Sequence, residues 1–162
     1  MNPCPCGYFT DPKKTCRCNS TKIERYLSKI SGPLLDRIDI HIDVPSLKYK
    51  EIVDSKLSEP SYQIKERVKK AHRIQKQRFK DEKIFFNSHM NHKQIKKYCA
   101  LNEEIIELLK AAMESMNLSA RAYDKILKVS RTIADLEGCE NIKTEYLSEA
   151  IEYRSLDRDF FV

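Results

Sequence analysis

The chain has 162 residues, of which 41% are hydrophobic and 33% charged, an ordinary balance for a helix-rich protein of one or two small domains. Its three glycines argue against a sandwich or barrel of many strands, which needs tight turns at short intervals. We find no apolar run near the roughly 20 residues that span a bilayer and no signal peptide, so we expect a cytoplasmic protein without a membrane partner. The net charge of +6 is compatible with nucleic acid as a partner but does not require it.

Residues 1–19 are rich in proline and cysteine and have neither a helical nor a strand period. Four of the six cysteines lie here, Cys4, Cys6, Cys16 and Cys18. In a reducing compartment, four clustered thiolates are the usual ligands of a structural Zn²⁺ ion, and metal binding would supply folding energy that so polar a segment cannot gain by burial. Each pair is separated by one residue, whereas two are more typical of zinc sites. The alternative is four reduced thiols in a loop.

A helical pattern from a capping box at Thr21 is ended by Ser31-Gly32-Pro33. Apolar and polar residues then alternate strictly from Ile38 to Val44, which predicts one strand with one buried face. A lone strand lacks hydrogen-bonding neighbours, so a longer chain or a second copy must complete the sheet. We therefore interpret residues 1–45 as the C-terminal part of a larger α/β core, and the sequence as a fragment.

Residues 46–60 are predicted to be a linker, and a long basic helix should follow over residues 61–79. The stretch from Lys65 to Lys83 holds nine basic and three acidic residues, so it carries a charge equal to that of the whole chain. Such a block usually forms only a solvated helix face. The alternative is contact with DNA phosphates, for which the candidates are Lys65, Lys69, Lys70, Arg73 and Lys76.

Four further helices are predicted, three after the caps Asn91, Asn102 and Ser119 and a fourth from Thr144, and Gly138 should end the third. Short loops predict that neighbouring helices pack antiparallel. The expected fold class is therefore mainly α, with one strand and a Cys-rich loop from an α/β core, followed by a helical bundle over residues 61–162. Cys99 occupies an apolar helical position, where we expect a small buried side chain.

Several long motifs in the right order resemble magnesium-chelatase-related AAA+ ATPases of the ComM/YifB-like group. Residues 1–8, 16–18 and 31–39 resemble the second half of the family's AAA+ module, residues 118–136 resemble its lid domain, and residues 150–158 resemble its C-terminal end. The resemblance implies a hexameric ring that binds ATP and Mg²⁺ and assembles with copies of itself. The ComM branch is implicated in branch migration of DNA, so DNA is an implied partner.

The resemblance also implies three residue roles. Asn2 lies where the family has its sensor 1 asparagine, which orients the attacking water, although a turn asparagine before proline would look the same. Arg37 resembles the arginine finger that enters the ATP site of the neighbouring protomer, whereas the residue alone suggests an ion pair with Asp36 or Asp39. Arg121 resembles sensor 2, which contacts the nucleotide phosphates, at a helix start where a cation is otherwise unfavourable.

No Gly-x-x-x-x-Gly-Lys-[Ser/Thr] loop occurs in the sequence, so we expect this chain alone neither to bind ATP tightly nor to hydrolyse it. The favoured function is the sensor, finger and lid part of a DNA-remodelling motor. The alternatives are a zinc-dependent nucleic-acid-binding module without ATPase activity, a purely structural helical adaptor and, within the family, a chelatase-type motor that acts on a protein client.

Overall fold

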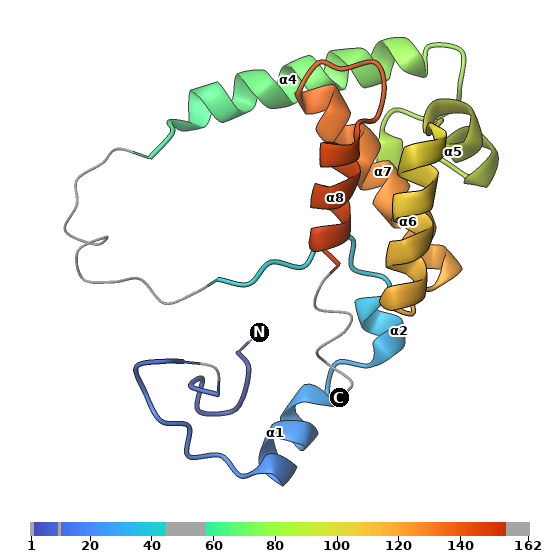
Figure 1. Ribbon diagram of the computed structural model, residues 1–162. Helices are drawn as coiled ribbons and strands as arrows, with labels where there is room; N and C mark the ends of the chain where they lie inside the picture. The colour runs from blue at the N-terminus through green and yellow to red at the C-terminus, as the bar shows by residue number, and fades with distance from the viewer. Residues whose placement is uncertain (1, 10, 45–57, 155–162) are drawn as a thin grey trace.

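The computed structural model describes residues 2–9, 11–44 and 58–154, and these are mainly helical, as predicted (Figure 1). The elements are α1 (Ser20–Leu27), α2 (Gly32–Leu35), α4 (Ser61–Arg78), the short 3₁₀ helix η1 (Asn87–His89), α5 (His92–Tyr98), α6 (Glu103–Ser115), α7 (Ala120–Leu136) and α8 (Thr144–Glu152). Within these residues there is no strand, and no helix is long and apolar enough to cross a membrane. Most of the predicted linker lies outside the described residues.

Helix boundaries follow the local capping chemistry of the sequence. The side chains of Asn91, Asn102 and Ser119 each accept a hydrogen bond from a backbone N–H in the first turn of α5, α6 and α7, as predicted. Gly138 has a φ of +68°, the left-handed conformation that favours glycine after a helix end. The predicted cap of α1 is wrong by two residues, because Asn19 accepts the hydrogen bond from the backbone N–H of Lys22.

The predicted strand at residues 38–44 does not form. This segment is extended, and its apolar side chains, including Ile40 and Ile42, are exposed, whereas His41 on the predicted polar face is buried. Its backbone is held from one side, where the N–H of His41 donates to the carbonyl oxygen of Tyr153 at 2.8 Å. The physical reason is that no second strand is found among the described residues. The backbone N–H and C=O groups of this segment therefore have no neighbouring strand with which to form a sheet.

Helices α5 to α8 form a bundle around α7. In Figure 1 the chain runs down through α6, back up through α7, which is inclined to it, and down again through α8. Helix α7 packs against α8, α4, η1 and α5, and α6 packs against α8. The extended segment at residues 38–44 leads from α2 and passes the end of α8, so it joins the N-terminal section to the bundle.

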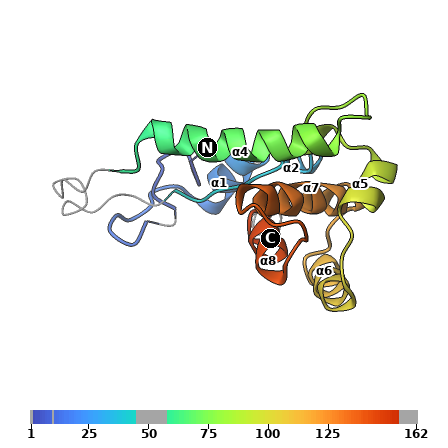
Figure 2. The ribbon, with the colours of Figure 1, turned by 90° about the horizontal axis from the view of Figure 1, so that it is seen from above.

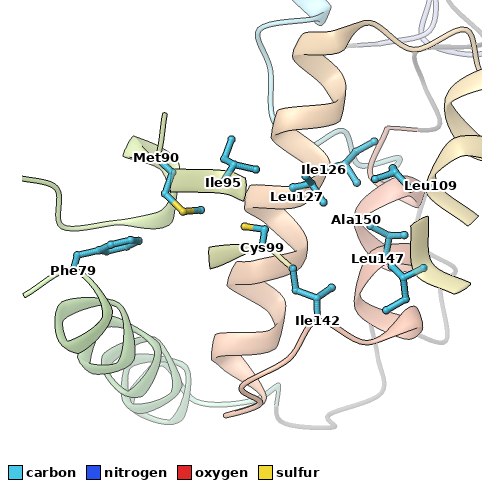
Figure 3. Packing of buried hydrophobic residues seen from close by; sticks show 11 residues of the cluster. Phe79, Met90, Ile95, Cys99, Leu109, Ile126, Leu127, Ile142, Leu147 and Ala150 are labelled. Atoms are coloured by element: carbon cyan, nitrogen blue, oxygen red, sulfur yellow. The ribbon is translucent and has the colours of Figure 1, made fainter. Parts of the chain in front are cut away.

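The core of this bundle is built from the apolar stripes that the sequence predicts. Figure 3 shows side chains from α5, α7 and α8 converging, together with residues that flank the helices. The buried cluster contains Phe79, Met90, Ile95, Cys99, Ile105, Leu109, Ile126, Leu127, Ile142, Leu147 and Ala150. Cys99 is buried as predicted, and desolvation raises the pKa of its thiol to about 11. It therefore behaves as a small apolar side chain.

Helix α4 crosses the bundle, and its first turns extend beyond it (Figures 1 and 2). Ala71 and Gln75 on its second half are buried against the bundle. Of the predicted apolar stripe, Ile64 and Val68 lie on the projecting first half and are exposed. Only the second half of this helix is thus anchored in the core.

Candidate functional site

The four cysteines of the N-terminal section lie close together, as their pattern predicts. The Sγ atoms of Cys4 and Cys6 are 3.3 Å apart, and Cys16 Sγ lies 3.7 Å from Cys4 Sγ and 3.6 Å from Cys6 Sγ. All four Sγ atoms, including that of Cys18, lie within 4.8 Å of one another. A tetrahedron of sulfurs about 2.3 Å from Zn²⁺ has edges of about 3.8 Å, so the sulfur positions fit this ion.

Local backbone geometry favours the thiolate form of one member of this cluster, Cys6. Gly7 has a φ of +83°, and its N–H donates to the Cys4 carbonyl oxygen at 3.0 Å, which closes the turn around the first pair. The backbone N–H of Tyr8, then that of Arg17 and the Cys4 thiol, donate to Cys6 and lower the pKa of its thiol to about 6. A thiolate is the form that binds a metal, so these hydrogen bonds favour binding at Cys6, whereas desolvation and the neighbouring thiols raise the pKa of Cys16 and Cys18 in the metal-free cluster. All four cysteines are free thiols.

A second cluster lies where α2 meets the start of α7. The carboxylate of Asp36 accepts from Ser119 Oγ at 2.7 Å and from Arg121 Nη1 at 3.3 Å. The Arg154 guanidinium, which is buried, lies 3.8 Å from the same carboxylate and donates to the Ile38 carbonyl oxygen. One aspartate thus joins residues from α7 and from the end of α8 to the segment that carries Arg37.

Arg37 follows this aspartate and is exposed. The ion pair with Asp36 or Asp39 that the residue alone suggests does not form, since Asp36 binds Arg121 and Asp39 pairs with Lys125. Lys125 Nζ also donates to the Arg37 carbonyl oxygen at 2.5 Å. The backbone of Arg37 is therefore fixed to α7, while its guanidinium makes no ion pair with any described residue.

Arg121 and Asn2 are both exposed, and they lie in different surroundings. The Arg121 side chain is 59% exposed and lines a depression together with Gly32, Asp36 and Ser119. Asn2 lies in the cysteine section, where its Nδ2 atom lies beside Gly7. The structure thus brings Arg37 and Arg121 to one junction and leaves Asn2 with the cysteines.

The five basic candidates on α4 are all exposed. Lys69 pairs with Glu66 at 2.7 Å, and Arg67 of the same basic stretch forms two hydrogen bonds to Glu59, of 2.7 and 2.9 Å. Within the described residues, no ion pair is found for Lys65, Lys70, Arg73 or Lys76. Four cations are therefore available to a partner.

Sequence reasoning missed a buried polar network around Asp135, which is fully buried. Its carboxylate accepts two hydrogen bonds from Arg78 at 2.5 and 2.7 Å, one from Asn87 at 2.8 Å and one from Arg131 at 3.2 Å. Arg131 also donates to the carbonyl oxygens of Cys139 and Glu140 at 2.5 Å each. The four-residue spacing of Arg131 and Asp135 was the only signal for this network in the sequence, and it indicates one pair of the set.

Comparison with known proteins finds matches over nearly the whole chain. A family model for the C-terminal region of the ChlI subunit of magnesium chelatase matches residues 58–154, and a second model, for the ChlI subunit of magnesium chelatase, matches residues 1–52. Competence protein ComM of Haemophilus influenzae is 42% identical over 159 residues. The uncharacterized YifB proteins of Salmonella typhimurium and Escherichia coli are 37% and 34% identical over 160 and 162 residues. Each alignment covers 98% of this chain but 30% of the relative.

Proposed function

Since the chain belongs to the magnesium chelatase ChlI family, we propose that it is the C-terminal part of a ring-forming AAA+ ATPase that remodels DNA. The chain spans about a third of the length of the relatives it matches, so the ATP-binding loop would lie in the remainder of such a protein. The exposed apolar residues of the segment at 38–44 support this proposal, because a longer chain would supply the strands that cover them.

The observation that carries the proposal is the state of Arg37 at the Asp36 junction. A residue that acts on a neighbouring protomer needs a fixed backbone and a free, permanently charged side chain. Arg37 meets both requirements, since Lys125 holds its carbonyl oxygen and its guanidinium is exposed. In an assembled ring this guanidinium would offset negative charge on the phosphates bound by the next protomer.

Arg121 has a complementary place in the proposal. It starts α7, which is the central helix of the bundle, and its bond to Asp36 ties that helix to the Arg37 segment. An exposed arginine at 3.3 Å from a single carboxylate oxygen is held weakly, because solvent screens such a pair. A nucleotide phosphate could therefore compete with Asp36 for it, and we assign Arg121 to phosphate contact on this basis.

The proposal also includes Zn²⁺ at Cys4, Cys6, Cys16 and Cys18. Four thiolates leave no open coordination position, so such an ion is structural and takes no part in hydrolysis. Support comes from the distances between the four sulfur atoms. The ion would order a section in which Cys4 is the one fully buried apolar side chain among the described residues 2–18.

The function is tested with the Arg37→Ala substitution in the complete protein. We expect ATP hydrolysis to fall by about 10³-fold or more, with nucleotide affinity unchanged, because the finger acts on the neighbouring site. Arg25→Ala is the matched control, since Arg25 is also exposed and lies on α1. An Arg37→Ala protein that hydrolyses ATP at the parent rate would refute the finger assignment, and loss of nucleotide binding would place Arg37 in the site of its own protomer.

A further inference from the structure

Two adjacent phenylalanines beside the basic helix are exposed without any role in the core. Phe85 is 69% exposed and Phe86 is 40% exposed, and both lie in the loop between α4 and η1. Single exposed apolar residues are common, but neighbouring large ones that form a patch usually mark a binding surface.

Phe86 is part of a line of rings that joins this loop to α4. Its ring centroid lies 5.0 Å from that of His72 on α4 and 5.6 Å from that of His89 on η1. All three side chains are exposed, and none belongs to the buried cluster. Contacts with His72 and His89 restrict the Phe86 ring, so the loop presents an aromatic surface next to α4.

Cations border these rings. His72 lies three residues after Lys69 and four before Lys76, positions that are neighbours on a helix surface, and Arg73 follows it directly. At about 100° per residue, Lys65, Lys69, Arg73 and Lys76 share one face of α4, on roughly the opposite side from the buried Ala71. The aromatic line therefore runs along the edge of a basic stripe that faces away from the bundle.

We propose that this surface, formed by Phe85, Phe86, His72 and the basic stripe of α4, binds single-stranded nucleic acid. Exposed rings offer stacking surfaces to unpaired bases, and the lysines and Arg73 offer charge to the backbone that joins them. A duplex hides its base faces, so the rings add nothing to duplex binding. The inference rests on the proposed function only in that both take nucleic acid as the partner, and it adds the strand form and the surface.

Sequence reasoning placed DNA contact on the cations alone, and the rings supply the discriminating feature. Phosphate contact by itself does not distinguish a strand with bases from a strand without them, whereas stacking does. The structure supplies stacking groups at the C-terminal half of the stripe, next to Arg73 and Lys76. The contribution of the cations to phosphate contact and that of the rings to base stacking can therefore be measured separately.

The test measures binding of the 162-residue chain to fluorescein-labelled oligomers of sixteen deoxythymidines, sixteen uridines and sixteen abasic sites, by fluorescence anisotropy. We expect the thymidine or uridine oligomer to bind at least tenfold more tightly than the abasic one, and the tighter of the two identifies the natural strand. In the Phe85→Ala/Phe86→Ala variant this preference should fall to about one, with abasic binding unchanged. A triple Lys65→Gln/Arg73→Gln/Lys76→Gln variant should weaken all three and reduce the salt slope by about 2.

Phe9→Ala is the matched control, because Phe9 is exposed and belongs to the cysteine section, which lies away from α4 in Figure 1. Phe85→Ala alone removes a ring that is 69% exposed and should not disturb folding, and Phe86→Trp should retain the preference. The proposal is overturned if the double variant keeps the parent preference, if base-bearing and abasic oligomers bind equally, or if Phe9→Ala removes the preference instead. It is also overturned if the double variant keeps strand binding but loses self-association in sedimentation. None of these results bears on Arg37, whose test is ATP hydrolysis.

Discussion

The buried carboxylate of Asp135 should be the most sensitive single position of the bundle. Removing it with Asp135→Ala would leave the Arg131 guanidinium, 3% exposed, and that of Arg78, 14% exposed, without their counter-ion. It would also leave the amide of Asn87 without its 2.8 Å acceptor. Breaking a buried ion pair by removing one partner typically costs about 3–5 kcal/mol, because the remaining charge stays desolvated.

This cost can be converted into a measurable shift. With a urea dependence of about 2 kcal/mol per molar for a domain of this size, a loss of about 4 kcal/mol moves the unfolding midpoint down by about 2 M. The assay is urea unfolding followed by circular dichroism at the helical minimum. A domain of ordinary stability, about 5–15 kcal/mol, would still be folded without denaturant. Asp135→Asn, which keeps the shape and one acceptor oxygen, should lose less than Asp135→Ala.

Asp124 offers a control on the same helix. Its carboxylate pairs with His92 at 3.1 Å, but the two side chains are 31% and 58% exposed. Exposed pairs contribute less than about 1 kcal/mol, so Asp124→Ala should move the midpoint by less than about 0.5 M. Equal shifts for Asp135→Ala and Asp124→Ala would refute the reasoning that burial of the network, and not the number of its contacts, determines the cost.

Two further outcomes are expected. Cys4→Ser should reduce bound zinc from about one ion per chain to near zero, measured by elemental analysis, whereas Cys139→Ser, a cysteine outside the cluster, should retain it; full zinc in Cys4→Ser would contradict the four-thiolate site. Glu82 accepts hydrogen bonds from Gln94, Tyr98 and Lys97, which lower the pKa of its carboxyl below 4.5. The stabilising contribution of these bonds is therefore complete above pH 4.5 and is lost as the pH falls through the lowered pKa. Glu82→Gln should therefore lower the urea midpoint at pH 7, and the gap to the parent protein should narrow as the pH falls below 4.5; a gap that does not narrow in acid would contradict this linkage.

The limits of sequence reasoning are clearest in the extended segment at residues 38–44. Alternation predicted a strand with its isoleucines buried, yet Ile40 and Ile42 are exposed and His41 is buried. The pattern indicates which residues share a side, but burial depends on what covers that side. Tyr153, more than a hundred residues later, decides where the His41 backbone lies, and no local pattern encodes that contact.

The candidate site residues divide in the same way. The cysteine spacing predicted the cluster because its four members lie within fifteen residues, and the structure brings their sulfurs together. The junction around Asp36 was not predicted, since its partners Ser119 and Arg121 lie 83 and 85 residues later. The contact of Phe86 with His72 was also missed. Phe86 lies beyond the end of the helix that carries His72, so no helical period relates the two residues.

The sequence by itself determined the helices of the bundle, the caps of α5, α6 and α7 and most of the apolar stripes, because these depend on residues within one or two turns of one another. It also determined the charge of α4 and the cluster of four cysteines, which are properties of composition and short spacing. Only the tertiary structure decided which charged side chains form ion pairs within the fold and which remain exposed. Arg78 belongs to the same basic stretch as Lys76, yet packing against α7 buries Arg78 on Asp135, 57 residues away, and leaves Lys76 exposed. Burying an unpaired charge is costly, so an arginine is buried only where it has a counter-ion. Arg78 obtains its counter-ion only when α4 packs against α7.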